Sequence, residues 1–463
     1  MNVILMISDT VRHDYCGCYG NTWVQTPNID ALASESAIME NFFSASFPTG
    51  PMRKDVHTGR FTFTYTNWQG PRVEGEEVLS EILSAEGYRT AFIGDTGNSE
   101  QIKAEFDYKE IIPGRASKID EIPEEVELPA DPRKLRVPMN RIQNIVRNAL
   151  GWDGEEDRRV ARTMRAAHKW LEEQHGSETP FFLFVDTFDP HEPWDQPNYY
   201  TELYDPDYQG DELMEPAYEP AAYTNQSEIQ HMCCMYAGKL TMVDRWIGYL
   251  LDGVEKMGLA GDTAIIFTSD HGFYHGEHNL IGKVLLDRDG AICGRWPLYS
   301  TIAHPPLLIR VPGVTDGQRH DSFCQPPDIK PTILDLLNAP VPSRVQGESL
   351  LPLIRRERQS IRDFAISSLT YVQDEEVRCP ASFRTKDFLY IYGGDEWSSE
   401  LYNLQSDPEE KQNIIDSRAD VAEQLHQQYL GCLEKLNCPK MSLDARREFN
   451  TTPRSSVPYR KLL

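Results

Sequence analysis

Long apolar runs without alternating polar residues constrain the fold of this chain more than any other sequence feature. A continuous apolar run predicts a strand buried on both faces, as in a parallel sheet covered by helices. Five segments have this character: Asn2–Ser8, Tyr88–Gly94, Phe181–Val185, Thr263–Thr268 and Leu307–Arg310. Segments with helical periodicity lie between them: Val78–Ala85, Asp157–Glu173 and Asn225–Gly253. This alternation predicts an α/β fold in which helices sandwich a large, mostly parallel sheet.

The pattern changes near residue 355. Pro331–Leu337 is expected to be a helix capped by Asp328, and beyond it the predicted strands become short before a late helix near Ala419–Leu436. We therefore expect a large domain over residues 1–355, a smaller C-terminal α+β domain over 356–440, and a polar arm or tail over 441–463. The stretch from about 105 to 140 is charged and proline-rich, and Glu121–Glu125 within it is expected to be an excursion over the surface.

The charge balance excludes one broad class of partner. The 463 residues carry a formal net charge of −26 at pH 7, whereas a protein that binds nucleic acid needs a basic face. A small anionic substrate needs only a local positive pocket, so it stays compatible with this charge. No run of about 18 apolar residues occurs, which predicts no membrane partner. Nine cysteines, an odd count, favour reduced thiols in a cytoplasmic protein. The sequence leaves a homo-oligomer open.

Polar side chains follow three of the predicted strands. Asp9 follows the first, Asp189 and His191 follow Phe181–Val185, and Asp270 with His271 follows Thr263–Thr268. Because the carboxyl ends of parallel strands meet at one edge of a sheet, these groups are expected to converge. Each has a simpler alternative, since Asp9 could cap a helix and Asp-His-Gly could form a turn.

The connection Phe47–Arg60 adds a hydroxyl group to this edge. Thr49 lies at an expected helix start, where free N–H groups favour an anion, so it is a candidate nucleophile for a phosphate or sulfate ester. A structural turn with a capping threonine is the alternative. Oxygen ligands with one imidazole suit Zn²⁺, Mn²⁺ or Ca²⁺, with Mg²⁺ also open. The predicted ligands of this single divalent cation are Asp9, Thr49, Asp270 and His271.

At this point the chain resembles the sulfatase branch of the alkaline phosphatase superfamily over nearly its whole length. The likeness rests on these segments: Ile7–Arg12, Gly17–Gly20, Thr26–Asp30, Pro51, Arg53, Thr58–Arg60, Asp189–Pro193, Phe267–Gly272, Gly282–Lys283, Pro331–Thr332, Leu401–Leu404 and Asp407–Pro408. The resemblance implies that residues 1–355 form the catalytic domain and that the metal is held by Asp9, Asp270 and His271. It also places Arg53 beside the nucleophile, and His191 and Lys283 on the ester oxygens.

The chain departs from the family pattern at four places. Thr49 stands where sulfatases carry the Cys or Ser that is oxidised to formylglycine, and threonine cannot give that aldehyde because its Cβ bears a methyl group. Met52 interrupts the usual Pro-Ser-Arg or Pro-Ala-Arg, Asp95-Thr96-Gly97 replaces a Lys-x-His, and Thr10 replaces the second of two aspartates. We expect the following residues to contact substrate: Thr10, Asp95, Asn98 and Trp194. A packing role is the alternative for Trp194.

These departures favour phosphorus chemistry. The leading hypothesis is a metal-dependent hydrolase of phosphate diesters or phosphonate monoesters, in which Thr49 is the nucleophile and Arg53 and Lys283 hold the ester oxygens. His191 would protonate the leaving oxygen or bind the ester, and the sequence leaves both roles open. The alternatives are a sulfate ester hydrolase that works without formylglycine and a catalytically retired member of the family. The spacing of Asp189, His191, His275 and His278 does not match a second metal site.

Overall fold

The computed structural model describes residues 1–68, 70, 72–97, 104–114, 119–136, 138–370 and 378–449, and its core is an eight-stranded sheet in the order β13-β2-β12-β7-β1-β6-β4-β5. The strands from β7 to β5 pair in parallel, while β12 runs antiparallel to both of its neighbours. The strand bounds are β1 Asn2–Ser8, β2 Ala37–Phe42, β4 Arg89–Gly94, β5 Tyr108–Ile111, β6 Phe181–Thr187, β7 Thr263–Thr268, β12 Leu307–Arg310 and β13 Arg319–Cys324.

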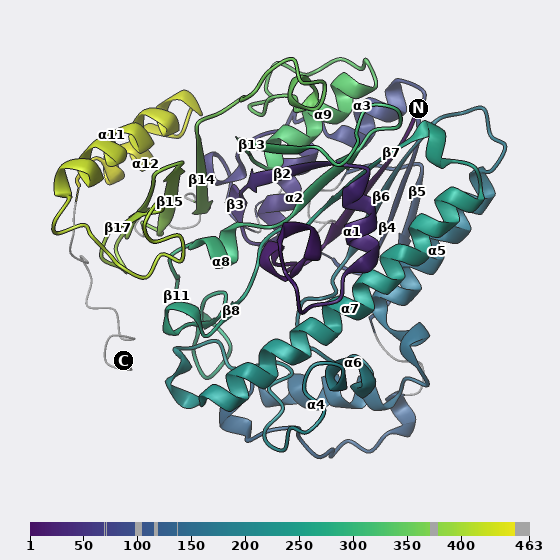
Figure 1. Ribbon diagram of the computed structural model, residues 1–463, viewed down its shortest axis with the longest axis horizontal. Helices are drawn as coiled ribbons and strands as arrows, with labels where there is room; N and C mark the ends of the chain where they lie inside the picture. Colours follow the sequence, from purple (N-terminus) through teal and green to yellow (C-terminus); the bar gives the residue numbers. More distant parts are fainter. Residues whose placement is uncertain are drawn as a thin grey trace.

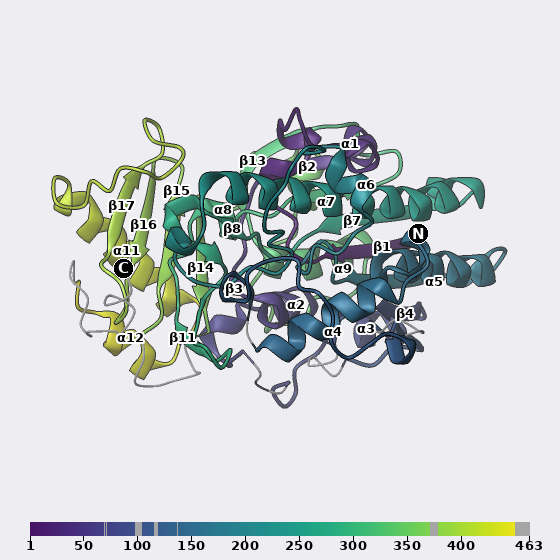
Figure 2. The ribbon, with the colours of Figure 1, turned by 90° about the horizontal axis from the view of Figure 1, so that it is seen from below.

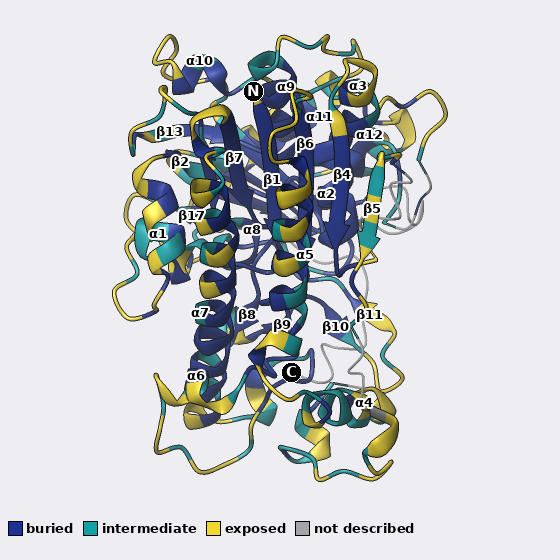
Figure 3. Cartoon of the chain, turned by 90° about the vertical axis from the view of Figure 1, so that its right-hand side faces the viewer, coloured by how far each residue is buried: buried dark blue, intermediate teal, exposed yellow. Residues whose placement is uncertain are grey.

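Helices cover both faces of this sheet, as the apolar runs predict. The helices on one face are α1 (Pro27–Ser34), α5 (Arg159–Gln174) and α7 (Gln226–Lys256). Those on the other are α2 (Thr49–Thr58), α3 (Leu79–Ala85), α9 (Ile329–Leu336) and α10 (Leu351–Ile354). Figure 3 shows α5 and α7 in front of the strands, with buried residues toward the sheet and exposed residues outward. The expected fold class is confirmed.

A second, smaller sheet lies at the other end of the molecule (Figures 1 and 2). Its order is β17-β16-β15-β14-β3, and helix α11 packs on it through an apolar cluster. The bounds of its elements are β3 Ser46–Phe47, β14 Phe364–Leu369, β15 Ala381–Thr385, β16 Phe388–Tyr392, β17 Glu400–Asn403, α11 Ala419–Lys435 and α12 Lys440–Arg446. Strand β3 comes from the N-terminal part of the chain, directly before Thr49. The small sheet is therefore built from both ends of the sequence.

The remaining short elements lie outside the two main sheets. They comprise helices α4 (Met139–Leu150), α6 (Asn198–Glu202) and α8 (Ser300–Ala303), and strands β8 (Tyr274–His275), β9 (Ile281–Gly282), β10 (Leu285–Leu286) and β11 (Ile292–Gly294). Within the described part of the chain, no helix combines the length and the apolar character that crossing a membrane requires.

The five strands predicted from long apolar runs are all present, but other strands were not predicted. Strand β5 lies within the charged, proline-rich stretch from 105 to 140, where no strand was predicted, and it forms the edge of the large sheet. Helix α12 reaches into the segment 441–463 that was expected to be an arm or tail. Residues 450–463 lie outside the described residues, as does Asn98.

Candidate active site

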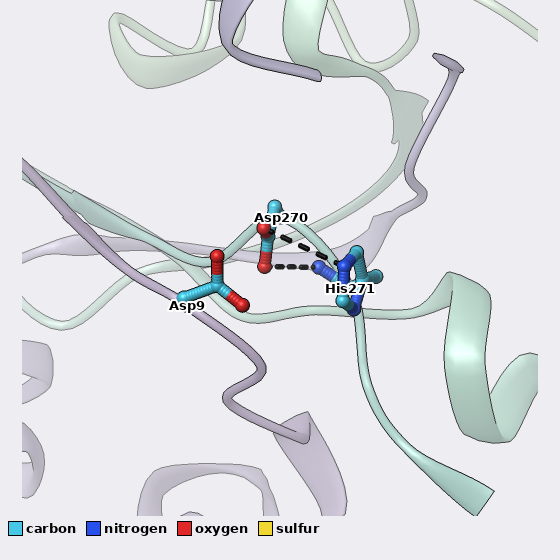
Figure 4. Close-up of side chains that lie close together, drawn as sticks. All are labelled: Asp9, Asp270 and His271. Carbon is cyan, nitrogen blue, oxygen red and sulfur yellow. Dashed lines mark hydrogen bonds and ion pairs between the residues drawn. The ribbon is translucent and has the colours of Figure 1, made fainter. Parts of the chain in front are cut away.

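The adjacent strands β1 and β7 bring Asp9, Asp270 and His271 together. The two strands pair in parallel, so the residues that follow them leave the sheet at the same edge. One ligand atom from each of the three side chains lies within 4.8 Å of the others, and all three residues are fully buried. Figure 4 shows the Asp9 carboxylate facing Asp270 and the His271 ring. The predicted convergence of these strand ends is present.

This donor set fits a divalent cation. Burial and the neighbouring charge of Asp270 raise the pKa of Asp9 well above its usual range. Asp9 Oδ2 is buried and accepts no hydrogen bond from the described residues. Two neighbouring carboxylates in the interior need compensation by positive charge, because buried like charges are costly. Two carboxylates and an imidazole are also ligands that zinc and manganese accept.

Arg53 lies beside the three residues on helix α2 and is fully buried. Its Nη1 donates to Asp270 Oδ2 at 2.7 Å, and its Nη2 lies 3.3 Å from Asp9 Oδ2. Its Nε and Nη2 donate to Asp186, and Nη1 also donates to the backbone oxygen of Thr49. These donors are directed at carboxylates and at the start of α2. Arg53 therefore holds the site together, which differs from the role of clamping ester oxygens.

Thr49 is the first residue of α2, and its hydroxyl faces His271. Thr49 Oγ1 lies 3.3 Å from His271 Nε2, while His271 Nδ1 lies 2.9 Å from the carbonyl oxygen of Gly272. A ring nitrogen beside a carbonyl oxygen must carry the proton, which leaves Nε2 free of hydrogen. Burial lowers the pKa of His271 to about 4, so the ring is neutral near pH 7. Its bare nitrogen is directed at the hydroxyl.

Lys283 reaches the same group of residues from the connection between β9 and β10. Its Nζ donates to Thr10 Oγ1 at 3.0 Å, and Thr10 Oγ1 donates to Asp9 Oδ1 at 2.7 Å. The amide of Thr10 donates to Asp270 Oδ1 at 2.9 Å. Thr10 has a φ of 65°, a conformation that is costly for a β-branched residue. The surrounding contacts hold this loop in a single position.

His191 follows β6 and stacks on Phe188, with 3.9 Å between the ring centroids. Its Nδ1 lies 2.6 Å from the backbone oxygen of Glu192, so this nitrogen carries the hydrogen. Burial, followed by the charge of Lys283, lowers the pKa of His191 well below its usual range. Its Nε2 is therefore a proton acceptor near pH 7, so the neutral ring has no proton on that nitrogen to give to a leaving oxygen.

Two predicted substrate contacts lie within the packed interior. The Asp95 carboxylate accepts hydrogen bonds from Thr163 Oγ1, Thr187 Oγ1 and the amide of Phe188. Burial and the charge of Asp189 raise its pKa to about 7. Trp194 is 1% exposed and packs in the apolar cluster around the start of α7. These contacts support the loop after β6, and neither residue joins the group around Asp9.

Two buried carboxylates at the candidate site were not predicted from the sequence. Asp186 lies at the end of β6 and binds Arg53, and Glu192 lies between His191 and Lys283. A signal was present for Asp186, because a charged residue within a buried strand requires a partner of opposite charge. Glu192 stands within Pro190–Pro193, but the sequence gives no indication that its side chain turns inward.

The fold and this group of residues define a class of enzyme, and comparison with known proteins agrees. The Sulfatase family model matches residues 1–339, and the model of the N-sulphoglucosamine sulphohydrolase C-terminal region matches residues 294–435. The chain belongs to the sulfatase family. It is thus an ester hydrolase of the sulfatase and alkaline phosphatase superfamily, whose members generally bind a divalent metal.

Known proteins resemble this chain in sequence and in fold. N-acetylglucosamine-6-O-sulfatase of Bacteroides thetaiotaomicron is 26% identical, over 89% of this chain and 82% of the relative. An arylsulfatase of Clostridium perfringens is 24% identical, over 90% of each chain. The crystal structure of the phosphonate monoester hydrolase of Agrobacterium radiobacter superposes with a TM-score of 0.73 at 21% identity, covering 94% of this chain and 95% of the other.

Proposed function

We propose that this chain hydrolyses phosphate diesters or phosphonate monoesters, with Thr49 as the nucleophile. The observation that carries the proposal is the 3.3 Å contact between Thr49 Oγ1 and the bare Nε2 of His271 at the start of α2. The N-terminus of a helix favours an anion, which suits a phosphoryl group beside that hydroxyl. The fold shared with the phosphonate monoester hydrolase is compatible with this substrate class.

The residues that would hold the metal are Asp9, Asp270 and His271, with the oxygen of Thr49 as a fourth donor. A divalent cation supplies Lewis-acid activation of a hydroxyl and neutralises charge that develops on ester oxygens. One nitrogen and several oxygen ligands favour Zn²⁺ or Mn²⁺ over Ca²⁺, which prefers six to eight oxygens. Elemental analysis of the purified protein tests this assignment, and about one zinc or manganese ion per chain is expected.

The remaining residues have separate roles in the proposed reaction. The bond from Thr49 Oγ1 to phosphorus forms as the bond from phosphorus to the alcohol oxygen breaks, and the alcohol leaves with the proton that Thr49 Oγ1 loses. Lys283 Nζ donates to an oxygen of the phosphoryl group, and Arg53 keeps the carboxylates and the start of α2 in place. Water then cleaves the threonine ester. The unprotonated Nε2 of His191 is the acceptor available for a proton of that water.

The test is a pair of substitutions at Thr49, assayed on bis(4-nitrophenyl) phosphate with Zn²⁺ or Mn²⁺. Thr49→Ala is expected to lower kcat/KM by about 10³-fold or more, because it removes the nucleophile. Thr49→Ser keeps the hydroxyl group and is expected to retain most of the activity. Metal content measured in both variants separates loss of the nucleophile from loss of the metal. Unchanged turnover by Thr49→Ala would exclude Thr49 as the nucleophile.

The names of the curated relatives favour a second candidate, a sulfate ester hydrolase. One relative is an N-acetylglucosamine-6-O-sulfatase and another is an arylsulfatase. Direct attack by threonine would leave a sulfate ester on the protein that water cleaves slowly, so this candidate ranks second. A comparison of 4-nitrophenyl sulfate with bis(4-nitrophenyl) phosphate separates the two, and a higher kcat/KM on the sulfate would favour the second candidate.

A further inference from the structure

A cavity of about 510 Å³ is lined in part by Arg136 and Tyr218, two residues that hydrogen-bond Glu192 next to His191. The residues that line it come from the segment before α4, the segment before α7 and strand β10. Its apolar wall is formed mainly by Leu135, Ala217, Tyr218 and Leu286, and its charged lining residues are of both signs: Arg133, Arg136, Glu219, Asp287 and Arg288. A mostly apolar cavity with a few polar groups is the usual character of a site for a small organic group.

Glu192 joins this cavity to the two residues expected to contact the ester. Its Oε1 accepts hydrogen bonds from Arg136 Nη1, at 3.0 Å, and from the hydroxyl of Tyr218. Its Oε2 lies 3.1 Å from His191 Nδ1 and 3.7 Å from Lys283 Nζ. Glu192 is fully buried, and Oε2 has no hydrogen-bond partner among the described residues. One carboxylate thus separates the cavity wall from both His191 and Lys283.

The backbone provides a second connection between the cavity and Lys283. Gly282 has a φ of 102°, and a Cβ atom at this position would lie only 2.5 Å from the Tyr218 ring. The absence of a side chain lets Tyr218 pack directly against the backbone of β9, which Lys283 follows. Leu286, three residues further on, lines the cavity. One short segment, from Gly282 to Leu286, therefore carries both Lys283 and part of the cavity wall.

We propose that this cavity binds the organic portion of the ester and that Glu192 is a positioning residue for Lys283 and His191. The proposal rests on the proposed function and names its substrate class more closely. The ligand is an ester whose organic portion has a flat apolar face, such as an aryl ring or one face of a sugar, which packs on Tyr218.

The first experiment measures binding and needs no turnover. Phenylphosphonic acid and methylphosphonic acid are titrated calorimetrically into the metal-containing protein, and the ratio of their Kd values is the preference for a ring. We expect wild type to prefer the phenyl compound by about tenfold or more, equivalent to about 1.4 kcal/mol. Leu286→Trp fills the cavity and is expected to remove the preference. The matched control is Val341→Trp, at a residue that is 48% exposed and does not line the cavity.

A ring preference that survives in Leu286→Trp would overturn the subsite, as would equal binding of the two probes by wild type. The second experiment compares hydrolysis of methyl and phenyl 4-nitrophenyl phosphate. Leu286→Trp is expected to lower kcat/KM for the phenyl ester relative to the methyl ester by about tenfold. If wild type cleaves neither ester, the proposed function fails, while the binding ratio still tests the subsite.

Glu192→Gln tests positioning, because it keeps the shape of the side chain and removes its charge. We expect kcat to fall about tenfold for both esters while KM changes less than twofold, and the pH dependence of kcat to shift. If the substitution only damaged the fold, fewer molecules would bind metal. The molecules that still bind metal would then keep the wild-type KM and pH profile. Wild-type kcat in Glu192→Gln would remove Glu192 from the proposal.

Discussion

His57 is a buried imidazole in helix α2 that packs against Phe184, with 4.8 Å between the ring centroids. Burial lowers its pKa to about 3, and the positive charges of Lys330 and Arg53 contribute in the same direction. Its Nδ1 has no hydrogen-bond partner among the described residues. The folded protein therefore keeps this ring neutral at pH values where an unfolded chain would protonate it.

This difference predicts a pH dependence of stability. Between pH 6.5 and about 3, unfolding lets His57 take up a proton, so the free energy of unfolding falls as the pH falls, by up to about 1.4 kcal/mol per pH unit. His57→Phe keeps a ring of similar size and removes this titration. Relative to the variant, wild type is expected to lose about 2 kcal/mol between pH 7.5 and pH 5 in urea unfolding. The exposed His175→Gln serves as the control.

Equal pH dependence in the two proteins would also be an interpretable result. If wild type and His57→Phe lose stability in parallel over this range, His57 is protonated in the folded protein, and the other buried histidines account for any acid instability.

Helix α7 contributes to the candidate site from a distance. Tyr236, near the middle of its buried face, donates to the backbone oxygen of Thr10 at 2.8 Å and accepts from the amide of Arg12 at 2.9 Å. These two bonds hold the loop after β1, in which Thr10 has a positive φ and donates to Asp270. The helix therefore supports the loop that orients two predicted metal ligands.

Tyr236→Phe leaves a buried amide and a buried carbonyl without a partner. Each costs about 1–3 kcal/mol, so the free energy of unfolding is expected to fall by about 2–6 kcal/mol, and zinc affinity is expected to fall as the loop loosens. Urea unfolding and competition with a chelating dye measure the two effects. Tyr249→Phe, on the same helix and 41% exposed, is expected to change stability by less than about 0.5 kcal/mol. Equal effects of the two substitutions would contradict this role of α7.

Elements with a strong apolar pattern could be predicted from the sequence, and weaker ones could not. The predicted bounds of β1, β7 and β12 match the structure, because their continuous apolar runs are sufficient to define a buried strand. Strand β2 contains Glu40 and Asn41 and was missed. It forms because β12 and β13 pair with it on both sides, and the sequence carries no local signal of those partners.

The same reasoning applies to the site. The convergence of Asp9, Asp270 and His271 follows from the parallel order of β1 and β7, so it could be predicted. The direction in which Arg53 points depends on contacts across 133 and 217 positions of sequence, and that of Glu192 on contacts across 26 and 56 positions. Those contacts have no periodic signal in the sequence, which is why Arg53 was expected on the ester oxygens and Glu192 was not considered.

At the scale of the whole molecule, the small C-terminal sheet supports the candidate nucleophile. Strand β14 pairs in parallel with β3, with Ser368 opposite Ser46 and Leu369 opposite Phe47, and Thr49 begins α2 two residues later. Gln325 Nε2 donates to the backbone oxygen of Ile366 at 2.8 Å, which ties β14 to the large domain as well. The region after residue 355 thus helps to hold Thr49 in place.

A chain shortened to residues 1–358 tests this arrangement. It lacks β14, so β3 loses its pairing partner and the buried Phe47 loses part of its cover. We expect the shortened chain to melt without a cooperative transition in circular dichroism and to lose hydrolysis of bis(4-nitrophenyl) phosphate. A chain ending at residue 449 keeps every strand of both sheets and is the control. Cooperative melting and wild-type activity of the shorter chain would show that the large domain folds and is active without the C-terminal region.

The pairing of β3 with β14 also has a consequence for how the enzyme is made. The hydroxyl of Ser367 donates to the backbone oxygen of Ser44 across 323 positions of sequence, and contacts of such separation form late and slowly. A ribosome that has translated only as far as residue 360 has already made every candidate catalytic residue, from Asp9 to Lys283, but has not yet made the strand that steadies the turn before Thr49. We therefore expect hydrolytic activity to emerge abruptly, near the end of translation, rather than gradually as the large domain emerges.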